Sequence, residues 1–122
     1  MVQEWNDSQP IYRQIRHRVV AMILDGVLTD GDPLPSVRTV ATESRVNPLT
    51  VLKAYQQLVD DGLVEKQRGR GMYVTAGARS LLLRDERARF LAEVWPEVRA
   101  TIERLGLAEE LLGEVSPRRK EV

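Results

Sequence analysis

The sequence predicts a mainly α-helical fold with one small β-hairpin, and three observations lead to that prediction. Apolar residues recur at helical spacing over 10–24, 36–44 and 47–60. Two short apolar segments then flank a glycine-rich connection, which is the pattern of a β-hairpin. Beyond the hairpin, helical periodicity returns over 80–105. The 122 residues suffice for one compact domain and a short appendage.

The first helix is expected over 10–24. Its apolar stripe recurs every four residues and consists of Ile11, Ile15, Val19 and Ile23. Pro10 suits a first helical turn, where its fixed φ fits and its missing N–H is not needed. Gly26 is expected to end the helix, because glycine tolerates the left-handed conformation that often follows a last turn.

A loop and a short second helix should follow. Gly31 and Pro33 predict the loop, over 28–35. Ser36 is placed to cap a helix that ends at about residue 44.

The third helix is predicted from Pro48 to about residue 60, after a turn at residues 45–46. Asn47 is a good N-cap, and proline suits the first helical position. Tyr55 falls on the apolar face of this helix, so we expect it in the core.

The hairpin comes next, with strands expected at 63–66 and 72–75. Between them, Gly69 and Gly71 permit the positive φ values that a tight connection needs. Three helices followed by a hairpin is the order of a winged helix-turn-helix, which we place at 8–75.

Residues 76–79 are mostly small and predict a linker into a helical region over 80–115. Pro96 lacks a backbone donor, so the helix should kink or split after Val94 or Trp95. A disordered tail would complete the chain at 116–122.

This second region carries an apolar stripe that is too large to leave in water. We therefore expect two copies of the chain to pack against each other through it as a helical dimerisation unit. The expected interface residues are Leu83, Phe90, Leu91, Val94, Trp95, Val98, Ile102 and Leu105.

The helix-turn-helix predicts which residues would contact DNA. In that motif the third helix enters the major groove and its first residues reach base edges. Backbone N–H groups at such a helix start also attract phosphate. The arginines on the glycine-rich wing suit a narrow minor groove. The candidate contacts are Arg38, Asn47, Leu49, Thr50, Lys53, Arg68, Gly69 and Arg70.

Composition excludes other functions. With no cysteine and one histidine, His17, the chain lacks the groups for disulfides, zinc ribbons or thiol catalysis, and neither a metal nor a cofactor is expected. No nucleophile with its base and no phosphate loop stands out, so we expect no enzyme. No segment has ~18 consecutive apolar residues, and no signal-peptide pattern opens the chain, so a cytoplasmic protein without membrane contact is expected. The net charge is zero, yet cations gather around the second and third helices and the wing.

Several motifs in order resemble the DNA-binding domain of the GntR family. They are Pro10-Ile-Tyr-Arg-Gln-Ile15, Leu34-Pro-Ser-Val-Arg38, Val46-Asn-Pro-Leu-Thr-Val51, Ala54-Tyr55, Leu58, Gly62-Leu63-Val64 and Gly69-Arg-Gly-Met-Tyr-Val74. The short remainder resembles the YtrA-like subfamily, with a small helical dimerisation unit. The resemblance implies DNA contact at Arg38, Arg45, Asn47, Thr50, Arg68, Gly69 and Arg70. It also implies repression, often of an operon that includes the regulator's own gene and an ABC transporter. One departure is Leu49, where the subfamily usually has a polar or basic residue.

We therefore expect a homodimeric regulator that binds palindromic, double-stranded operator DNA. The sequence leaves open whether a small-molecule effector binds as well. The alternative is a winged-helix module that binds another protein. That alternative predicts acidic residues at the start of the third helix and on the wing, where Asn47, Thr50, Arg68 and Arg70 stand instead.

Overall fold

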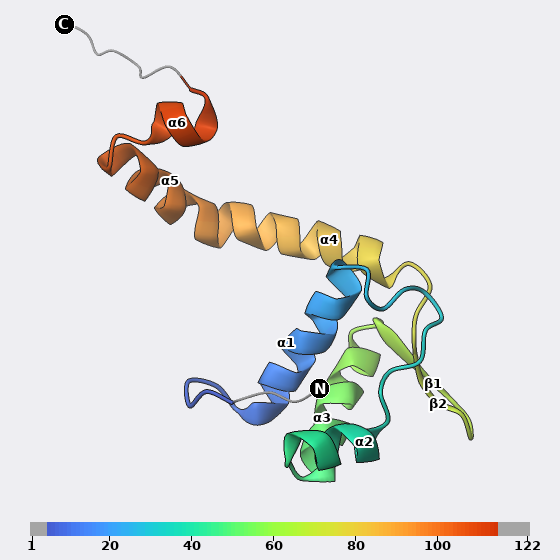
Figure 1. Ribbon diagram of the computed structural model, residues 1–122. Helices are drawn as coiled ribbons and strands as arrows, with labels where there is room; N and C mark the ends of the chain where they lie inside the picture. Colours follow the sequence, from blue (N-terminus) through green and yellow to red (C-terminus); the bar gives the residue numbers. More distant parts are fainter. Residues whose placement is uncertain (1–4, 115–122) are drawn as a thin grey trace, which may run out of the picture. The chain divides into compact units, whose positions relative to one another are not determined.

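The computed structural model describes residues 5–114, which form two compact units that divide between Leu83 and Arg84 (Figure 1). The first unit contains α1 (Ile11–Leu24), α2 (Val37–Ser44), α3 (Pro48–Asp60), β1 (Val64–Gln67), β2 (Gly71–Val74) and the first half of α4 (Ala78–Arg89). The second contains the rest of α4, a π-helix (Phe90–Val94), α5 (Trp95–Arg104) and α6 (Ala108–Leu112). The mainly α-helical fold with one hairpin is thus confirmed. The tail predicted at 116–122 lies outside the described residues.

The starts of α2 and α3 are capped as the sequence predicts. The Ser36 hydroxyl accepts the Thr39 N–H at 3.0 Å, and the Asn47 side chain accepts the Leu49 N–H at 2.8 Å. Each cap satisfies a backbone donor that has no partner inside its helix. Between them, Arg45 ends α2 in the left-handed region, with a φ of 56° that is uncommon for a residue other than glycine.

The hairpin is confirmed, with both strands displaced by one residue from the predicted positions. β1 pairs antiparallel with β2. Leu63 stays outside β1 because its N–H donates to Leu58 O at the end of α3, at 3.0 Å. The turn closes when Arg70 donates its N–H to Gln67 O at 2.9 Å, which leaves Gly71 to begin β2.

The loop before α2 runs beside β2 and extends the hairpin. Pro33 forms a bridge with Tyr73, and the Leu34 N–H donates to Met72 O at 2.9 Å. Because Ser36 follows closely, this pairing ties the start of α2 to the wing.

The core lies in the first unit and draws on α1, α2, α3 and the hairpin. Its largest fully buried side chains are Tyr55, Ile15, Ile23, Leu58, Val19, Val40, Val51, Val64 and Val74. The expectation that Tyr55 packs inside is therefore confirmed. Burial of these apolar side chains is what positions the polar surface described below.

The linker predicted at 76–79 is wrong in its second half, because α4 begins at Ala78. Ala78 and Leu82 are buried in the core, at 1% and 5% exposure. Arg79 donates from Nε to Leu24 O at 3.0 Å, where α1 ends. Ala78, whose small side chain suggested a linker, instead packs against the core, where only a small side chain is needed. The start of α4 is therefore part of the first unit.

The helix interruption predicted near Pro96 is confirmed. It takes the form of a π-helix, Phe90–Val94, directly before α5. Proline removes a backbone donor and crowds the preceding turn, and the wider π turn accommodates both effects. The last helix begins at Ala108, after Gly106 with a φ of 71°.

Candidate nucleic-acid interface

The start of α3 lies on the surface of the first unit. Val51 and Tyr55 face the core, at 0% and 1% exposure. On the opposite side Asn47 and Leu49 are exposed, Leu49 at 70%, and Thr50 is half-buried. The side chains that the sequence predicted for a DNA groove are therefore accessible.

The backbone donors at this helix start are already engaged, which corrects one expectation. Pro48 has no N–H, and the Leu49 N–H donates to the Asn47 side chain. The Thr50 N–H donates to Asn47 O at 2.9 Å. The sequence predicted that these backbone groups would attract a phosphate. The Asn47 amide and the Thr50 hydroxyl carry side-chain donors at the same place.

Arg38 and Arg45 stand exposed at opposite ends of α2. Arg38 lies in the first turn of that helix, and Arg45 ends it two residues before Asn47. A guanidinium presents five N–H donors in a planar fork that matches phosphate oxygens or a guanine edge. Helix α2 packs against α3, so both arginines belong to the helix-turn-helix.

The wing tip carries the remaining cations. Arg68, Gly69 and Arg70 are all exposed. Gly69 has a φ of 72°, which a side chain would strain. The tyrosine hydroxyl of Tyr73 donates to Arg70 O at 3.2 Å and so braces the turn. The two guanidiniums therefore project from a tight turn with a fixed backbone.

A hollow of about 230 Å³ joins the wing to the start of α2. Lys66 and Arg70 line it from the wing, and Ser36 lines it from α2. Tyr55 also lines it and donates its hydroxyl to Pro35 O at 2.7 Å. Burial raises the pKa of Tyr55, so this hydroxyl remains a neutral donor. The wing and the second helix thus share one surface.

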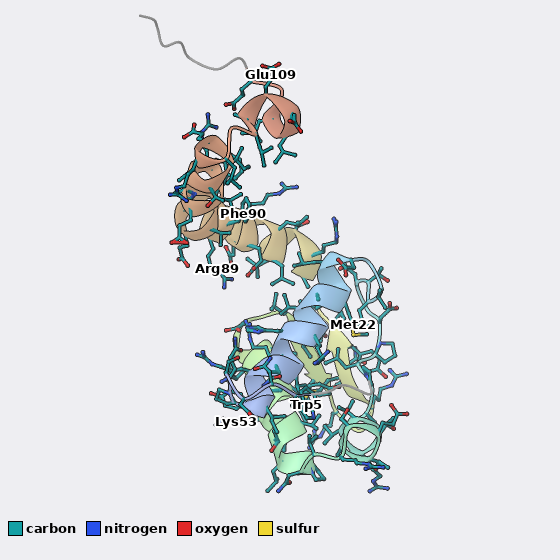
Figure 2. The ribbon with its side chains drawn as sticks, turned by 60° about the vertical axis from the view of Figure 1, so that its left-hand side comes forward. Trp5, Met22, Lys53, Arg89, Phe90 and Glu109 are labelled. Atoms are coloured by element: carbon teal, nitrogen blue, oxygen red, sulfur yellow. The ribbon has the colours of Figure 1, made fainter. Side chains whose placement is uncertain are left out.

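Lys53 is a candidate whose side chain is already held, by a residue that the sequence did not single out. Figure 2 labels Lys53 on α3. Its Nζ lies 4.0 Å from the centroid of the ring of Tyr12 on α1. Such a cation–π contact is worth about 0.5–1 kcal/mol at an exposed site. In the sequence, Tyr12 stands only beside the apolar stripe of the first helix. No sequence periodicity pairs it with Lys53.

The predicted dimer residues divide into two groups by exposure. The exposed group, between 38% and 64%, is Phe90, Leu91, Val94, Val98 and Leu105. The half-buried group is Leu83, Trp95 and Ile102. Leu111 is exposed at 61% and was not predicted, because the short helix that carries it lies beyond the periodic stretch. None of the described residues of the second unit is buried.

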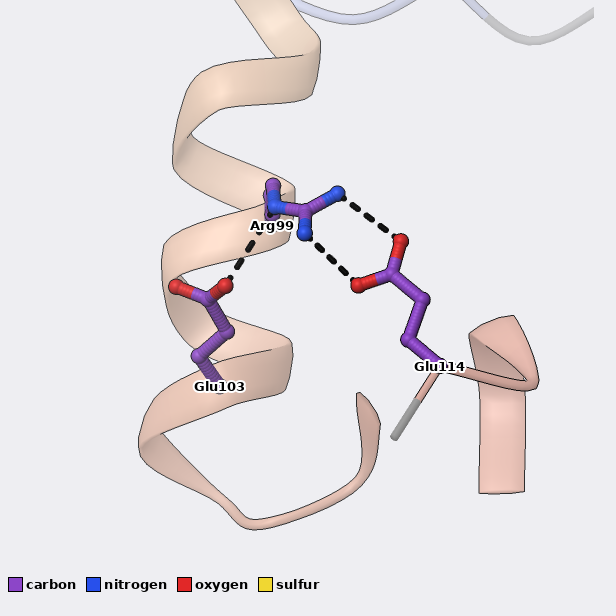
Figure 3. Close-up of polar contacts among 3 residues, drawn as sticks. All are labelled: Arg99, Glu103 and Glu114. Atoms are coloured by element: carbon purple, nitrogen blue, oxygen red, sulfur yellow. Dashed lines mark hydrogen bonds and ion pairs between the residues drawn. The ribbon is translucent and has the colours of Figure 1, made fainter. Parts of the chain in front are cut away.

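An arginine fixes the end of this second unit (Figure 3). Arg99 donates from both Nη atoms to the Glu114 carboxylate, at 2.6 and 3.1 Å, and from Nε to Glu103 at 3.3 Å. The hydrogen bonds and charge of Glu114, with a smaller effect of Glu103, raise the pKa of Arg99. These pairs tie α5 to the segment that follows α6.

Over residues 5–114, no group of three or more histidine, aspartate or glutamate side chains is arranged to hold a metal ion. Within the same range, every helix is too short or too polar to cross a membrane.

Residues 11–74 match the family model of bacterial regulatory proteins of the gntR family. Over 76 residues the chain is 45% identical to the HTH-type transcriptional repressor YtrA of Bacillus subtilis (strain 168). That match covers 62% of this chain and 58% of the relative, so the chain spans about three fifths of that relative's length.

Two solved structures have a similar fold. A GntR family transcriptional regulator from Listeria monocytogenes matches with a TM-score of 0.67 and 30% identity, covering 88% of this chain and 93% of the other. YtrA from Sulfolobus acidocaldarius, a GntR-family transcription factor, matches with a TM-score of 0.57 and 39% identity, covering 74% and 95%. These similarities extend from the sequence to the fold.

Proposed function

Since this chain belongs to the GntR family of bacterial regulatory proteins, we propose that it is a YtrA-like transcription regulator that binds operator DNA. One observation carries the proposal. The exposed, polar start of α3 lies in the first unit with an arginine-bearing turn before it and an arginine-bearing wing after it. A winged helix-turn-helix uses this arrangement to insert its third helix into the major groove.

Helix α3 would read the bases. Asn47 and Thr50 can donate to base edges, and the exposed Leu49 side chain can pack against a thymine methyl group. Leu49 gives the groove an apolar contact where a polar one is usual, so we expect thymine opposite it.

Arginines on both sides would hold the backbone and the minor groove. Arg38 and Arg45 fork to phosphates, and Arg68 or Arg70 enters the adjacent minor groove. Gly69 lets the wing backbone approach the duplex closely.

Tight binding requires two copies. One winged module covers about 600–1,000 Å² of protein surface on DNA, and a twofold dimer doubles that area. A palindrome with half-sites ~34 Å apart then matches the symmetry of the protein. The exposed apolar residues of the second unit, Leu91 and Val98 among them, are the surface that we assign to the dimer.

Repression is the expected outcome of operator binding, as the name of the Bacillus subtilis relative indicates for that protein. We propose the chain's own operon, with ABC transporter genes, as the target. A reporter gene fused to that promoter should become more active when the gene that encodes this chain is deleted. Unchanged or reduced activity would contradict repression while leaving DNA binding open.

The direct test is binding to an operator selected from random double-stranded DNA. Arg38→Ala should weaken binding roughly tenfold and, where the contact is to phosphate, reduce the salt slope by about one. Fluorescence anisotropy over a salt series measures both. Arg104→Ala, an exposed arginine in the last turn of α5, is the matched control and should change neither. If no sequence is enriched, or if Arg38→Ala binds like the parent, the proposed interface is wrong.

A further inference from the structure

Residues 5–9, which we name the N-terminal arm, pack against α1 and the end of α2. Trp5, labelled in Figure 2, donates from its indole Nε1 to Ser44 O at 3.4 Å, across 39 positions of sequence. None of the DNA contacts proposed above uses this arm. Its role therefore has to be inferred from its contacts with α1 and α2.

A buried glutamine anchors the arm to α1. Gln14 is only 7% exposed. Its Oε1 accepts the Asn6 N–H at 3.1 Å, and its Nε2 donates to Asn6 O at 2.9 Å and to Gln9 O at 2.8 Å. Burying a polar side chain is costly unless its hydrogen bonds are made. The arm supplies these bonds, so its docking is built into the core.

Trp5 meets α2 at its last carbonyl. The final carbonyls of a helix have no partner inside it, and the indole N–H supplies one to Ser44. The next residue, Arg45, has the left-handed φ of 56°, which is costly for a residue with a side chain. On its other side the ring faces Arg18, whose guanidinium carbon lies 4.9 Å from the ring centroid. Trp5 therefore contacts α1 through Arg18 and donates to the Ser44 carbonyl, which directly precedes the strained Arg45.

We propose that Trp5 is a positioning residue for operator recognition. Through the Nε1–Ser44 hydrogen bond it fixes the turn between α2 and α3, and with it the direction of Arg45 and of the first residues of α3. The inference rests on the proposed DNA-binding function and adds a residue that would not touch DNA.

Trp5→Phe tests the hydrogen bond, because phenylalanine keeps an aromatic ring for Arg18 and removes the N–H donor together with part of the ring surface. Specific operator affinity should fall about fivefold to tenfold, the equivalent of one hydrogen bond. Affinity for non-operator DNA should fall less, because only the phosphate contact assigned to Arg45 depends on this turn, and the salt slope should fall by no more than about one. A side chain that only stabilised the fold would move the melting temperature but neither of these affinities at a temperature where the protein is folded. Trp5→Ala should lose at least as much affinity as Trp5→Phe.

A double-mutant cycle tests whether Trp5 acts through the turn. Glycine adopts the left-handed conformation without penalty, so in an Arg45→Gly background the turn needs less support. Trp5→Phe should then cost little further affinity. Full additivity of the two changes would overturn the proposal.

The matched control is Thr101→Val, which also removes one side-chain hydrogen bond to a helix carbonyl, Glu97 O, but in the second unit. It should leave operator affinity unchanged. An unchanged affinity in Trp5→Phe, while Arg38→Ala still weakens binding, would overturn the positioning role alone. A parent protein that selects no operator would overturn the proposed function and this inference with it.

Discussion

The two units of this chain treat their apolar side chains in opposite ways. Residues 5–83 enclose a core in which Ile15, Val51 and Leu58 have no exposed surface. Among residues 84–114 no side chain is buried, and Leu91 and Leu105 are more than 60% exposed. Exposed apolar patches of this kind mark interaction surfaces. The difference teaches that the first unit carries an apolar core of its own, whereas we propose that the second gains one from a second copy of the chain.

The largest expected effect comes from placing charge on the exposed stripe. Leu91→Glu with Val98→Glu should give monomers, because an apolar interface does not accommodate unpaired carboxylates. Operator affinity should fall roughly a hundredfold or more, as two linked half-site contacts become one. Sedimentation equilibrium measures the first effect and fluorescence anisotropy the second.

The control for this pair is Ala92→Glu with Ala100→Glu. These alanines are exposed and belong to the same two helices, one or two positions away from the stripe residues. They add the same charge, and the dimer should persist. A dimer that survives the stripe substitutions would show that the exposed apolar side chains of the second unit have another purpose.

A smaller effect distinguishes the two units by stability. Leu58→Ala leaves a cavity in the first unit and should lower the free energy of unfolding by about 2–5 kcal/mol, independently of protein concentration. Leu105→Ala removes a side chain that is 64% exposed in one chain. Its effect on the melting temperature should depend on protein concentration, because it acts through association. Calorimetry over a concentration series checks both, and a concentration-independent loss in Leu105→Ala would argue against a role in the dimer.

Local signals in the sequence predict most of the first unit. Ser36 and Asn47 mark helix starts because a cap acts within three residues, and Gly69 marks the wing because only the local backbone decides its φ. The apolar stripe of α1 predicts which face is buried. Each of these is a short-range effect, which a single sequence can carry.

The features that the sequence does not predict are contacts between residues that lie far apart along the chain. Trp5 reaches Ser44 and Tyr12 reaches Lys53, and no periodicity links either pair. The assignment of Ala78 to a linker fails for the same reason, since only the packed core shows that a small side chain is needed there. For the candidate DNA interface, the sequence predicts which residues of each helix and of the wing take part. It does not predict the contacts that orient their side chains.

The smallest expected effect lies in a loop of the first unit and depends on pH. The Thr29 N–H and hydroxyl donate to the Asp32 carboxylate at 2.8 and 2.9 Å, which lowers its pKa below the ordinary 3.8. Because the folded pKa is the lower one, this stabilisation is present above the ordinary pKa and is lost as the pH falls through the folded value. Asp32→Asn should therefore destabilise the protein slightly at neutral pH and cease to differ from the parent in strong acid. Thr29→Val, which removes only the hydroxyl donor, should raise the pKa of Asp32 partway in an NMR titration of its carboxyl carbon. The difference in the free energy of unfolding between Asp32→Asn and the parent could instead stay constant through the acid range. Asp32 would then act in this loop without its charge. The loop would owe its conformation, like the core of the first unit, to packing.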